Sequence, residues 1–470
     1  MSRRDELIEL CRREPEKIID LLLALEAKVA SLEIRLNRTS KNSDKPPSSD
    51  GLKKLPHQGS KSKRKPGGQK GHRGTTLKFS DQPDQIIEHR LDYCQDCGAS
   101  LDQVKGAVVS RRQEIEIPEK PVQIIEHQCL EKPCPGCGCR NRGHWPEHVS
   151  GNVQYGPRFK AFCIYLLNYQ LLPYDRTGEL LSTLFGYQPG GGTLQSMLEQ
   201  AYTALEPIEK AIKAAVRASP VGHGDETSLR VDGQTKWLHV FSNLVYTYYY
   251  WSQHRGQKAH QADGCLPEYG GILMHDAYRS YFGYGYPHAL CNAHLLRELQ
   301  ALYETDQTQR WAWYLMRLLR LAWTWVKTAR ETGNTDLADR PRDRIVALFE
   351  HIVIQAARQN PPAQRQPGQP GRLAQSPARN LIDRLLQHQD AYLRFLTDFR
   401  VPFDNNLAER DLRMTKLQQK ISGCFRTPQG TNLFCRIRGY ISTLRKQGYE
   451  LLPALLSLWS DTPFIPVPAE

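Results

Sequence analysis

"GDETSLRVDGQTKWLHVFSNLVYTYYYW", residues 224–251, reads as three consecutive β-strands. Each run is rich in β-branched and aromatic residues, and the runs are separated by "DGQ" and by a tight turn near Asn243. The predicted strands are "GDETSLRV", "TKWLHVFSN" and "LVYTYYYW". A fourth apolar run, "GGILMHDAY" at 270–278, is predicted to be a buried strand.

Long helices follow these strands. Residues 292–358 are predicted to be helical, and a break rich in Pro, Gln and Arg at 359–379 precedes further helices. Mixed strands followed by helices indicate an α/β core that carries a helical insertion. We assign the core to 219–440, the insertion to 292–398 and a C-terminal tail to 441–470.

Two acidic residues lie at the ends of predicted strands. Asp225 is at the head of the first strand and Asp276 at the end of the fourth. Burying a carboxylate without a partner is costly, so two such acids favour a bound cation. Glu409, on a later helix, would complete an oxygen cage suited to Mg²⁺, and two ions about 3.5 to 4 Å apart would promote phosphoryl displacement. On spacing alone other acids compete: Asp232, Asp263, Asp404 and Glu226.

The helix that carries Glu409 also carries several basic residues. Read at 100° per residue, "FDNNLAERDLRMTKLQQK" (403–420) and the residue after it have an apolar side formed by Leu407, Met414, Leu417 and Ile421. Glu409 shares the other side with Arg413, Lys416 and Lys420. The simplest alternative is a surface ion pair between Glu409 and Arg413. If Glu409 binds metal, the basic residues would instead hold the phosphates of a nucleic acid, together with Arg426 in the following "GCFRT".

Size and charge limit the classes of function. A chain of 470 residues with 40% hydrophobic residues can bury several cores, which favours two or more domains. Lys and Arg number 63 against 50 Asp and Glu, and the net charge of +13 favours a polyanionic partner. No apolar run approaches the ~20 residues that span a bilayer, and the first residues lack the apolar core of a signal peptide, so we expect a cytoplasmic protein.

Twelve cysteines in a large chain of this kind favour reduced thiols or bound metal over disulfides. Residues 77–150 are predicted to form a module of short strands with two cysteine knuckles, "CQDC" and "CPGC", which contain Cys94, Cys97, Cys134 and Cys137. Two such pairs supply the four ligands of a tetrahedral structural Zn²⁺. Cys129 or Cys139 could replace a nominal ligand, and the alternatives to zinc are a redox pair or unpaired thiols.

The N-terminal region has two parts. In residues 1–38, apolar residues from Ile18 to Leu36 recur at alternating spacings of four and three, as in a coiled coil that joins two chains; the alternative is a helix that packs on its own chain. Residues 39–76 are predicted to be a flexible basic linker, because they are rich in Lys, Arg, Pro, Gly and Ser and almost free of apolar residues. Within it, three residues are predicted to contact phosphates: Lys63, Arg64 and Lys65.

Residues 151–218 are predicted to be helical. Two helices, "LPYDRTGELLSTLFG" and a second that opens at Thr193 as its N-cap, are joined by the Gly-rich "YQPGGG". This pattern allows a DNA-binding helix-turn-helix whose presented face contains Gln195, Ser196, Glu199 and Gln200. A plain helical bundle fits the same periodicity.

Several motifs together resemble the large transposase of the insertion sequence 66 family. They run through most of the chain: "KNSDKPPSSDG", the paired CxxC knuckles, "LPYDRTGELLSTLFG", "GGTLQSML", "HDAYRSYF", "CNAHLLREL" and "FDNNLAERDLRMTKLQQKISGCFRT". The resemblance implies an RNase H-like catalytic core whose DDE triad is Asp225, Asp276 and Glu409. It also implies strand cleavage and strand transfer at transposon ends that depend on Mg²⁺ or Mn²⁺.

Three further residues lie beside the predicted acid site. Cys291 and His294 of "CNAHLLREL" are close to the metal-bearing strands, but two ligands do not make a zinc site, so we expect structural roles. His275, next to Asp276, is expected to order the site or contact DNA rather than act as a general base, because bound metal activates water without one.

The predicted architecture is a multidomain α+β protein with an N-terminal coiled coil, a zinc-binding β module, a helix-turn-helix and an RNase H-like core with a helical insertion. The leading hypothesis is a DNA transposase that dimerises through its coil and binds terminal inverted repeats and target DNA at the bacterial nucleoid. Small accessory transposition proteins are expected as further partners. One alternative is a non-catalytic, zinc-containing DNA-binding regulator, and another is an RNase H-like nuclease that hydrolyses DNA without joining it.

Overall fold

The computed structural model describes most of the chain beyond residue 78. The described residues are 79–105, 107–118, 121–137, 139–364, 373–460 and 463–466, with Glu16, Leu25 and Val29. Apart from those three positions, the predicted coiled coil and basic linker lie outside the described residues. The chain divides into two compact units, a larger one that contains Glu147–Thr183 and Tyr187–Glu470 and a smaller one that contains Lys53–Pro146 and Leu184–Gly186.

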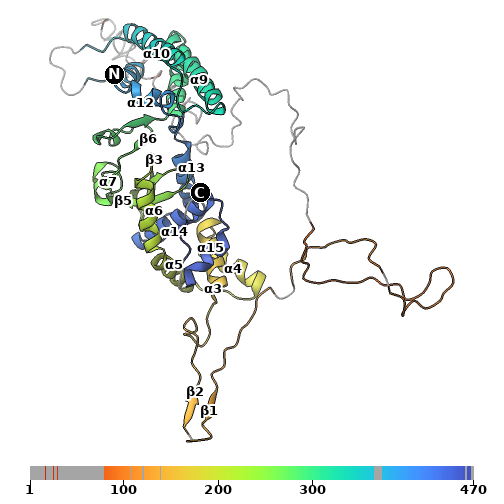
Figure 1. Cartoon of the computed structure of the whole chain (residues 1–470). Helices are drawn as coiled ribbons and strands as arrows, with labels where there is room; N and C mark the ends of the chain where they lie inside the picture. Colours follow the sequence, from red (N-terminus) through yellow and green to blue (C-terminus); the bar gives the residue numbers. More distant parts are fainter. Residues whose placement is uncertain are drawn as a thin grey trace, which may run out of the picture. The chain divides into compact units, whose positions relative to one another are not determined.

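A five-stranded mixed sheet forms the centre of the larger unit (Figure 1). Its strand order is β5-β4-β3-β6-β7, and the bounds are β3 Val221–Val231, β4 Gln234–Ser242, β5 Thr247–Ser252, β6 Ile272–His275 and β7 His288–Leu290. β3, β4 and β5 form an antiparallel meander, whereas β6 and β7 run parallel to β3. The four predicted strands and the mixed α and β class are confirmed. β7 was not predicted, because three residues are too few to show a pattern.

The two turns of the meander follow from local sequence. Asp232 and Gly233 join β3 to β4, and both have positive φ, 48° and 68°. Two residues with positive φ make the turn whose twist matches that of the flanking strands, which explains the Asp-Gly sequence. At the next turn the side-chain Oδ1 of Asn243 accepts hydrogen bonds from the amides of Val245 and Tyr246 at 2.9 and 2.6 Å. The predicted turn positions are therefore confirmed.

One face of the meander is covered by helix α13 (Asn406–Ser422). Leu238 and Val240 of β4 pack in a buried cluster with Ala408 and Leu412 of the helix. The buried ridge of α13 is formed by Ala408, Leu412 and Thr415. The predicted apolar side is not the packed one, since Leu417 and Ile421 are 41% and 40% exposed. The sheet selects the ridge of small and aliphatic residues spaced four and three apart, and not the longer side chains beside it.

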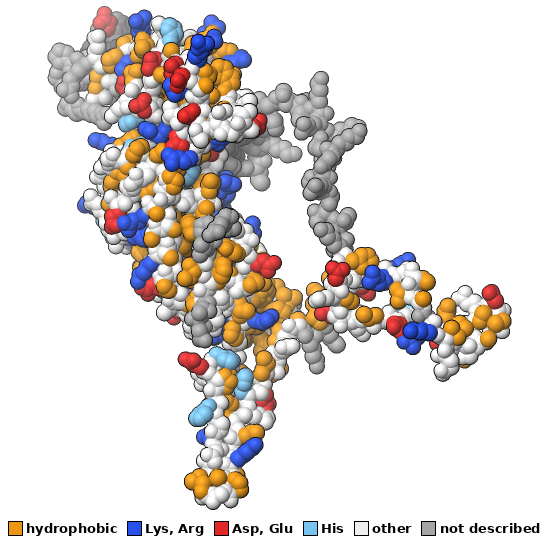
Figure 2. Space-filling view, in the orientation of Figure 1, with side chains coloured by type: hydrophobic (Ala, Val, Ile, Leu, Met, Phe, Trp, Pro, Cys, Tyr) orange, Lys and Arg blue, Asp and Glu red, His pale blue; other side chains and the backbone are white. Residues whose placement is uncertain are grey.

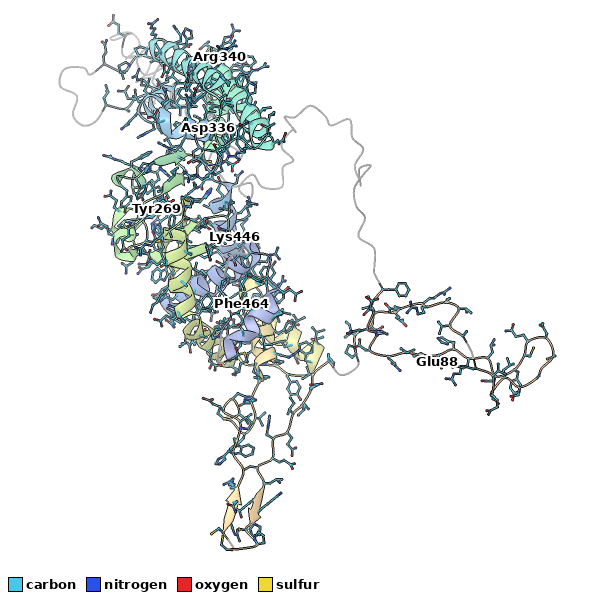
Figure 3. The ribbon with its side chains drawn as sticks, in the orientation of Figure 1. Glu88, Tyr269, Asp336, Arg340, Lys446 and Phe464 are labelled. Atoms are coloured by element: carbon cyan, nitrogen blue, oxygen red, sulfur yellow. The ribbon has the colours of Figure 1, made fainter. Side chains whose placement is uncertain are left out.

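Helix α14 (Pro428–Lys446) packs on β5 and continues past residue 440. The predicted boundary between core and tail therefore falls inside a helix. Lys446, which is labelled in Figure 3, donates from Nζ to the carboxylate of Asp411 at 2.8 Å and to the carbonyl oxygen of Asn243 at 2.9 Å. These contacts fix the end of α14 to both α13 and the β4–β5 turn. The chain then forms α15 (Leu451–Leu456).

The helical region before the sheet contains α3 (Pro157–Ile164), followed by a π-helical turn, and then α4 (Tyr174–Phe185), α5 (Gly191–Ala204) and α6 (Glu206–Arg217). α5 begins at Gly191 with Gly190 at its N-cap, so Thr193 lies inside the first turn and the prediction of Thr193 as the cap is wrong. α5 and α6 are separate helices because Pro207 in the first turn of α6 cannot continue a helix from α5.

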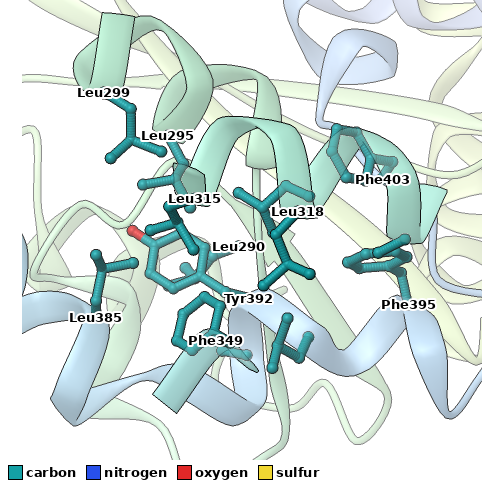
Figure 4. Close-up of a cluster of buried hydrophobic side chains, with 14 of the residues drawn as sticks. Leu290, Leu295, Leu299, Leu315, Leu318, Phe349, Leu385, Tyr392, Phe395 and Phe403 are labelled. Carbon is teal, nitrogen blue, oxygen red and sulfur yellow. The ribbon is translucent and has the colours of Figure 1, made fainter. Parts of the chain in front are cut away.

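The predicted insertion is helical, which confirms that part of the prediction. Its elements are α8 (Asn292–Thr305), α9 (Arg310–Glu331), α10 (Asp339–Gln359), α11 (Pro377–Gln387) and α12 (Gln389–Leu393). Figure 4 shows Leu295 of α8 and Leu315 of α9 in one apolar cluster with Phe349 of α10. The cluster also includes Met274 of β6 and Leu290 of β7. The insertion is thus packed against the β6–β7 side of the sheet. No helix among the described residues is long and apolar enough to cross a membrane.

In the smaller unit the described strands are one antiparallel pair, β1 (Glu131–Pro133) and β2 (Arg140–Arg142). Residues 77–150 were predicted to contain short strands, and the strand-like segments at 85–93, 111–117 and 122–130 do not form strands. Their apolar side chains are exposed, as Figure 2 shows in orange; Ile86 is 77% and Ile124 81% exposed. Among the described residues of the smaller unit, the two-stranded ribbon has no second layer on which such residues could be buried, which explains the difference from the prediction.

Candidate active site

Asp225 and Asp276 lie side by side on neighbouring parallel strands. Residues 221, 222 and 223 of β3 are paired with 272, 273 and 274 of β6, and the same register continued by two residues brings Asp225 level with Asp276. Paired residues of adjacent strands share a face and are separated by about 4.8 Å. Two acids far apart in the sequence are therefore neighbours in the sheet.

Both acids face helix α13. On β4, Val240 is opposite Asp225, and Val240 packs in the buried cluster with Ala408 and Leu412 of α13. Because directly opposed residues lie on one face of a sheet, the Asp225 side chain shares this face. Glu409 is in the first turn of the same helix. The fold thus directs all three predicted catalytic acids to one side of the sheet.

Asn405 fixes the start of α13 against the strands. Its Nδ2 donates to the carbonyl oxygen of Gly224 at 3.0 Å, and its Oδ1 lies 2.8 Å from Nδ1 of His223. Its backbone amide donates to Sγ of Cys291 at 3.2 Å. The Asn405 side chain is 1% exposed. Glu409 follows one helical turn later, so these contacts set where its carboxylate can reach.

The acids repel one another electrostatically. Burial raises the pKa of Asp225 well above its ordinary value, and the negative charges of Asp276, Glu226 and Glu409 raise it further. The amide of Glu226 donates to Asp225 Oδ1 at 2.8 Å and opposes this effect only in part. Uncompensated negative charge of this kind is relieved by a cation.

Glu226 is not a competitor for the site, because it points to the opposite face of β3. Its carboxylate is fully buried and accepts hydrogen bonds from Arg255 Nε at 2.9 Å and from the Tyr281 hydroxyl at 2.6 Å. Burial raises the pKa of Glu226 to about 7. The Arg255 guanidinium also lies over the ring of Tyr278, 4.1 Å from its centroid. Glu226 is therefore paired with Arg255 and Tyr281 on the face of the sheet opposite to α13.

The other competing acids are engaged elsewhere. Asp263 accepts a hydrogen bond from the Tyr248 hydroxyl at 2.6 Å and is 3.3 Å from Lys213 Nζ. Asp404 accepts from the amide of Asn406 at 3.1 Å, before α13 begins. Asp232 is in the turn between β3 and β4. This placement favours Asp225 and Asp276 over the alternatives that spacing left open.

A chain of hydrogen bonds holds the backbone just after Asp276. Ala277 has a φ of 69°, a left-handed conformation that costs free energy for a residue with a side chain. Its amide donates to Nδ1 of His275 at 3.2 Å, so Nε2 of His275 carries the proton and donates to Nδ1 of His288 at 3.1 Å. Burial lowers the pKa of His275 well below its ordinary value, in agreement with this neutral form. His275 thus orders the turn that presents Asp276.

Cys291, His294 and Glu409 form a second group of potential ligands. Their S, N and O ligand atoms lie within 4.8 Å of one another, the one group of three or more such residues found in the part of the chain that the structure describes. Oε1 of Glu409 is 3.7 Å from Nδ1 of His294 and 3.7 Å from Nη2 of Arg297. The sequence analysis missed Arg297 and this contact with Glu409, because α8 and α13 are far apart in the chain and no local pattern joins them.

Comparison with known proteins shows the family of this chain. A profile of the IS66 transposase family matches residues 152–433, which is more than half of the chain and contains the three acids. The chain belongs to the IS66 transposase family. A profile of a family of unknown function matches residues 8–78.

A related protein, the uncharacterized protein y4hP of Sinorhizobium fredii, is 23% identical to this IS66 family member over 383 residues. The match covers 72% of this chain, and the chain spans 65% of the length of that protein.

The basic residues predicted to bind phosphates in this IS66 family member have different surroundings. Arg413, Lys420 and Arg426 are exposed to solvent. Lys416 is half-buried, and its Nζ donates to both the carbonyl oxygen and the hydroxyl of Ser228 on β3. Burial lowers the pKa of Lys416. Lys416 therefore links α13 to the sheet, whereas the other three basic side chains face the solvent.

Gln195 on α5 is bound within the protein. Its Oε1 accepts from the Tyr174 hydroxyl at 2.8 Å, and its Nε2 donates to Glu199 at 2.9 Å. On the same helix Gln200 accepts from Lys160 Nζ at 3.0 Å. Lys63, Arg64 and Lys65 of this IS66 family member lie outside the described residues.

The first cysteine knuckle forms a tight turn. The amide of Gly98 donates to the carbonyl oxygen of Cys94 at 3.0 Å, and the amides of Cys97 and Asp96 lower the pKa of the Cys94 thiol. A lowered pKa favours the thiolate, which is the metal ligand. In the second, the amide of Cys134 donates to the carbonyl oxygen of Cys139 at 2.7 Å. Across the described residues, the two knuckles do not form one group of ligands.

Proposed function

We propose that this chain is a DDE transposase that cuts DNA at the ends of an insertion sequence and joins the cut strand to target DNA. The observation that carries the proposal is the placement of Asp225 and Asp276 at one level of adjacent parallel strands, beneath the helix that bears Glu409. The topology supports it, since an antiparallel meander extended by two parallel strands is the arrangement of an RNase H-like core. Membership of the IS66 family supports DNA as the substrate.

The acid site fits a hard divalent cation. The ligands are carboxylate oxygens, the type that Mg²⁺ and Mn²⁺ prefer, and the pKa of Asp225 is raised by burial and by the negative charges of Asp276, Glu226 and Glu409. When bound, Mg²⁺ would supply activation of the attacking oxygen and stabilisation of the leaving oxygen. Asp225, Asp276 and Glu409 would hold it.

The protein's own residues would position the DNA. Asp225 and Asp276 are presented by a packed sheet, and Glu409 by a helix that Asn405 holds against it. Exposed Arg413, Lys420 and Arg426 would hold phosphates of the bound strand. In cleavage, water would attack the phosphorus and break its bond to the 3′ oxygen, which leaves a 3′ hydroxyl and a 5′ phosphate. In joining, that hydroxyl would attack a target phosphodiester in line and release the target strand's own 3′ hydroxyl.

The other regions would supply assembly and end recognition. We assign pairing of two chains to the N-terminal coil, sequence-independent affinity to the basic linker, and reading of the terminal repeats to the zinc module and the α4–α5 region. Exposure of apolar residues in the smaller unit supports a module that folds fully with Zn²⁺ or DNA bound. Small accessory proteins encoded nearby would complete the assembly.

Cleavage and joining of end-bearing DNA with Mg²⁺ or Mn²⁺ tests the proposal. Glu409→Gln should abolish both reactions while DNA binding persists, and Asp232→Asn should react as the wild type does, since Asn also tolerates the positive φ of that exposed turn. Undiminished joining by Glu409→Gln rules the proposal out. Cleavage without joining indicates a nuclease instead, and binding without cleavage indicates a regulator.

A further inference from the structure

The position of the Glu409 carboxylate is not explained by hydrogen bonding. Oε1 is buried and has no hydrogen-bond partner among the described residues. Nδ1 of His294 and Nη2 of Arg297 are both 3.7 Å away, which is within reach of an ion pair with Arg297 but longer than a hydrogen bond. A buried carboxylate oxygen in this state is costly, and it indicates a missing partner.

The missing partner could be a cation that Cys291 and His294 bind together with Glu409. Cys291 is the N-cap of α8 and His294 follows three residues later, so both side chains are on one side of the helix. With Glu409 they give one sulfur, one nitrogen and one oxygen ligand within 4.8 Å. Three such ligands with a fourth position open to water are a common set for Zn²⁺, whereas a sulfur ligand does not suit Mg²⁺.

This group lies next to the acid site. The pairing of His275 with Leu290, continued by one residue, brings Cys291 level with Asp276, and the Cys291 amide donates to the carbonyl oxygen of His275 at 3.0 Å. Asp225, Asp276 and Cys291 thus form a row across three adjacent strands. The three acids do not form a close ligand group in the described structure, whereas Glu409 does so with Cys291 and His294.

We propose that Cys291, His294 and Glu409 bind a thiophilic divalent cation such as Zn²⁺, and that this binding holds Glu409 away from Asp225 and Asp276. Binding would form a metal–sulfur bond and release the Cys291 thiol proton to solvent. Arg297 would move away as the cation enters. The metal site itself depends only on the three ligands, whereas the inhibition rests on the proposed catalytic role of Glu409.

Titration of the full-length protein with Co²⁺ tests the site, because thiolate-bound Co²⁺ absorbs by charge transfer. Cys291→Ser, His294→Gln and Glu409→Gln should each bind one equivalent fewer than wild type, while the knuckle cysteines contribute equally in every protein. Cys265→Ser is the matched control, since Cys265 is also buried but outside the group. Equal stoichiometry in wild type and all three variants overturns the site.

The effect of Zn²⁺ on DNA cleavage at fixed Mg²⁺ tests the consequence. We expect micromolar Zn²⁺ to lower the wild-type rate at least tenfold and to lower the His294→Gln rate by a clearly smaller factor. Equal inhibition of the two proteins overturns the proposed withdrawal of Glu409. If Co²⁺ stoichiometry behaves as expected but Glu409→Gln still cleaves DNA, the proposed function fails and the metal site stands. If Glu409→Gln is inactive but binds as much Co²⁺ as the wild type, the metal site fails and the proposed function stands.

Discussion

Asn405 joins helix α13 to strand β3 by donating a hydrogen bond from Nδ2 to the carbonyl oxygen of Gly224 at 3.0 Å. The same side chain meets Nδ1 of His223, so one buried amide fixes the helix that carries Glu409 to the strand that carries Asp225. Relative placement of the two acids therefore depends on a residue that is buried between the helix and the strand.

Asn405→Ala should lower the rate of strand cleavage more than it lowers affinity for DNA, because it loosens Glu409 and leaves the exposed basic residues in place. Loss of partners for buried polar groups should also cost about 1–3 kcal/mol of unfolding free energy. Single-turnover cleavage and denaturant unfolding measure the two effects. Asn406→Ala, an exposed neighbour, is the control. A wild-type cleavage rate in folded Asn405→Ala would show that Asn405 does not position the site.

Lys416 and Lys420 should behave differently although both are on α13. Lys420 is exposed, so Lys420→Met should reduce the slope of log affinity for DNA against log salt by about 1. Lys416 is bound to Ser228, so Lys416→Met should lower thermal stability and leave that slope unchanged. Salt titration of DNA binding with both variants decides between the two roles. If the slope fell for Lys416→Met and not for Lys420→Met, Lys416 rather than Lys420 would be the residue that contacts phosphate.

His260 makes the stability of the core dependent on pH. The side chain is fully buried, stacked on Tyr281 and edge-on to His239, and burial lowers its pKa to about 4 from an unfolded value of 6.5. The unfolded state binds the proton first, so stability is full above pH 6.5 and falls as the pH drops toward 4. The shift corresponds to about 3 kcal/mol.

His260→Phe keeps an aromatic ring at this position but removes the titrating group. Its unfolding free energy should therefore fall less than that of wild type between pH 6.5 and 4, when both are followed by denaturant unfolding. His254→Gln is the control, because His254 is exposed. The same acid sensitivity in wild type and His260→Phe would remove His260 as its cause.

Zinc content should depend on the first cysteine knuckle. Cys94→Ser should lose one equivalent of bound Zn²⁺ and weaken binding to end-bearing DNA, because the described residues of the smaller unit expose their apolar side chains and form no core that would hold the unit without metal. Cys424→Ser, an exposed cysteine outside both knuckles, should change neither. Elemental analysis and DNA binding on the same samples measure both effects. Full zinc content in Cys94→Ser would exclude Cys94 as a ligand.

Much of the fold follows from local patterns in the sequence. Strands β3 to β6 were predictable because their apolar runs end at turns, such as Asp232-Gly233, whose conformation only certain residues adopt. Asp276 was recognisable in a similar way, as a charged residue directly after an apolar strand. Asp225 was predicted at the head of its strand but lies inside it, because β3 begins four residues earlier, at Val221. Local pattern thus predicted the main strands of the sheet, whereas the catalytic role of the acids stays a prediction.

Contacts between distant elements were not predictable in this way. The ridge of α13 that packs on the sheet is set by the surface of β3 and β4, so Lys416 could not be assigned to Ser228 from helical periodicity. The approach of His294 and Arg297 to Glu409 likewise depends on how α8 leaves β7. Such contacts are fixed by tertiary packing, which a single sequence does not encode in any local window.

His275 should act on catalysis through the backbone of Asp276. His275→Phe removes the acceptor for the Ala277 amide, so the left-handed turn at Ala277 loses the hydrogen bond that holds it, and the Asp276 carboxylate is no longer fixed. We expect the maximal rate of strand cleavage to fall at least tenfold with little change in DNA affinity. His275→Asn, whose side-chain oxygen can also accept, should restore part of the rate. A general base would give the opposite result, because Asn cannot take up a proton and would be as inactive as Phe.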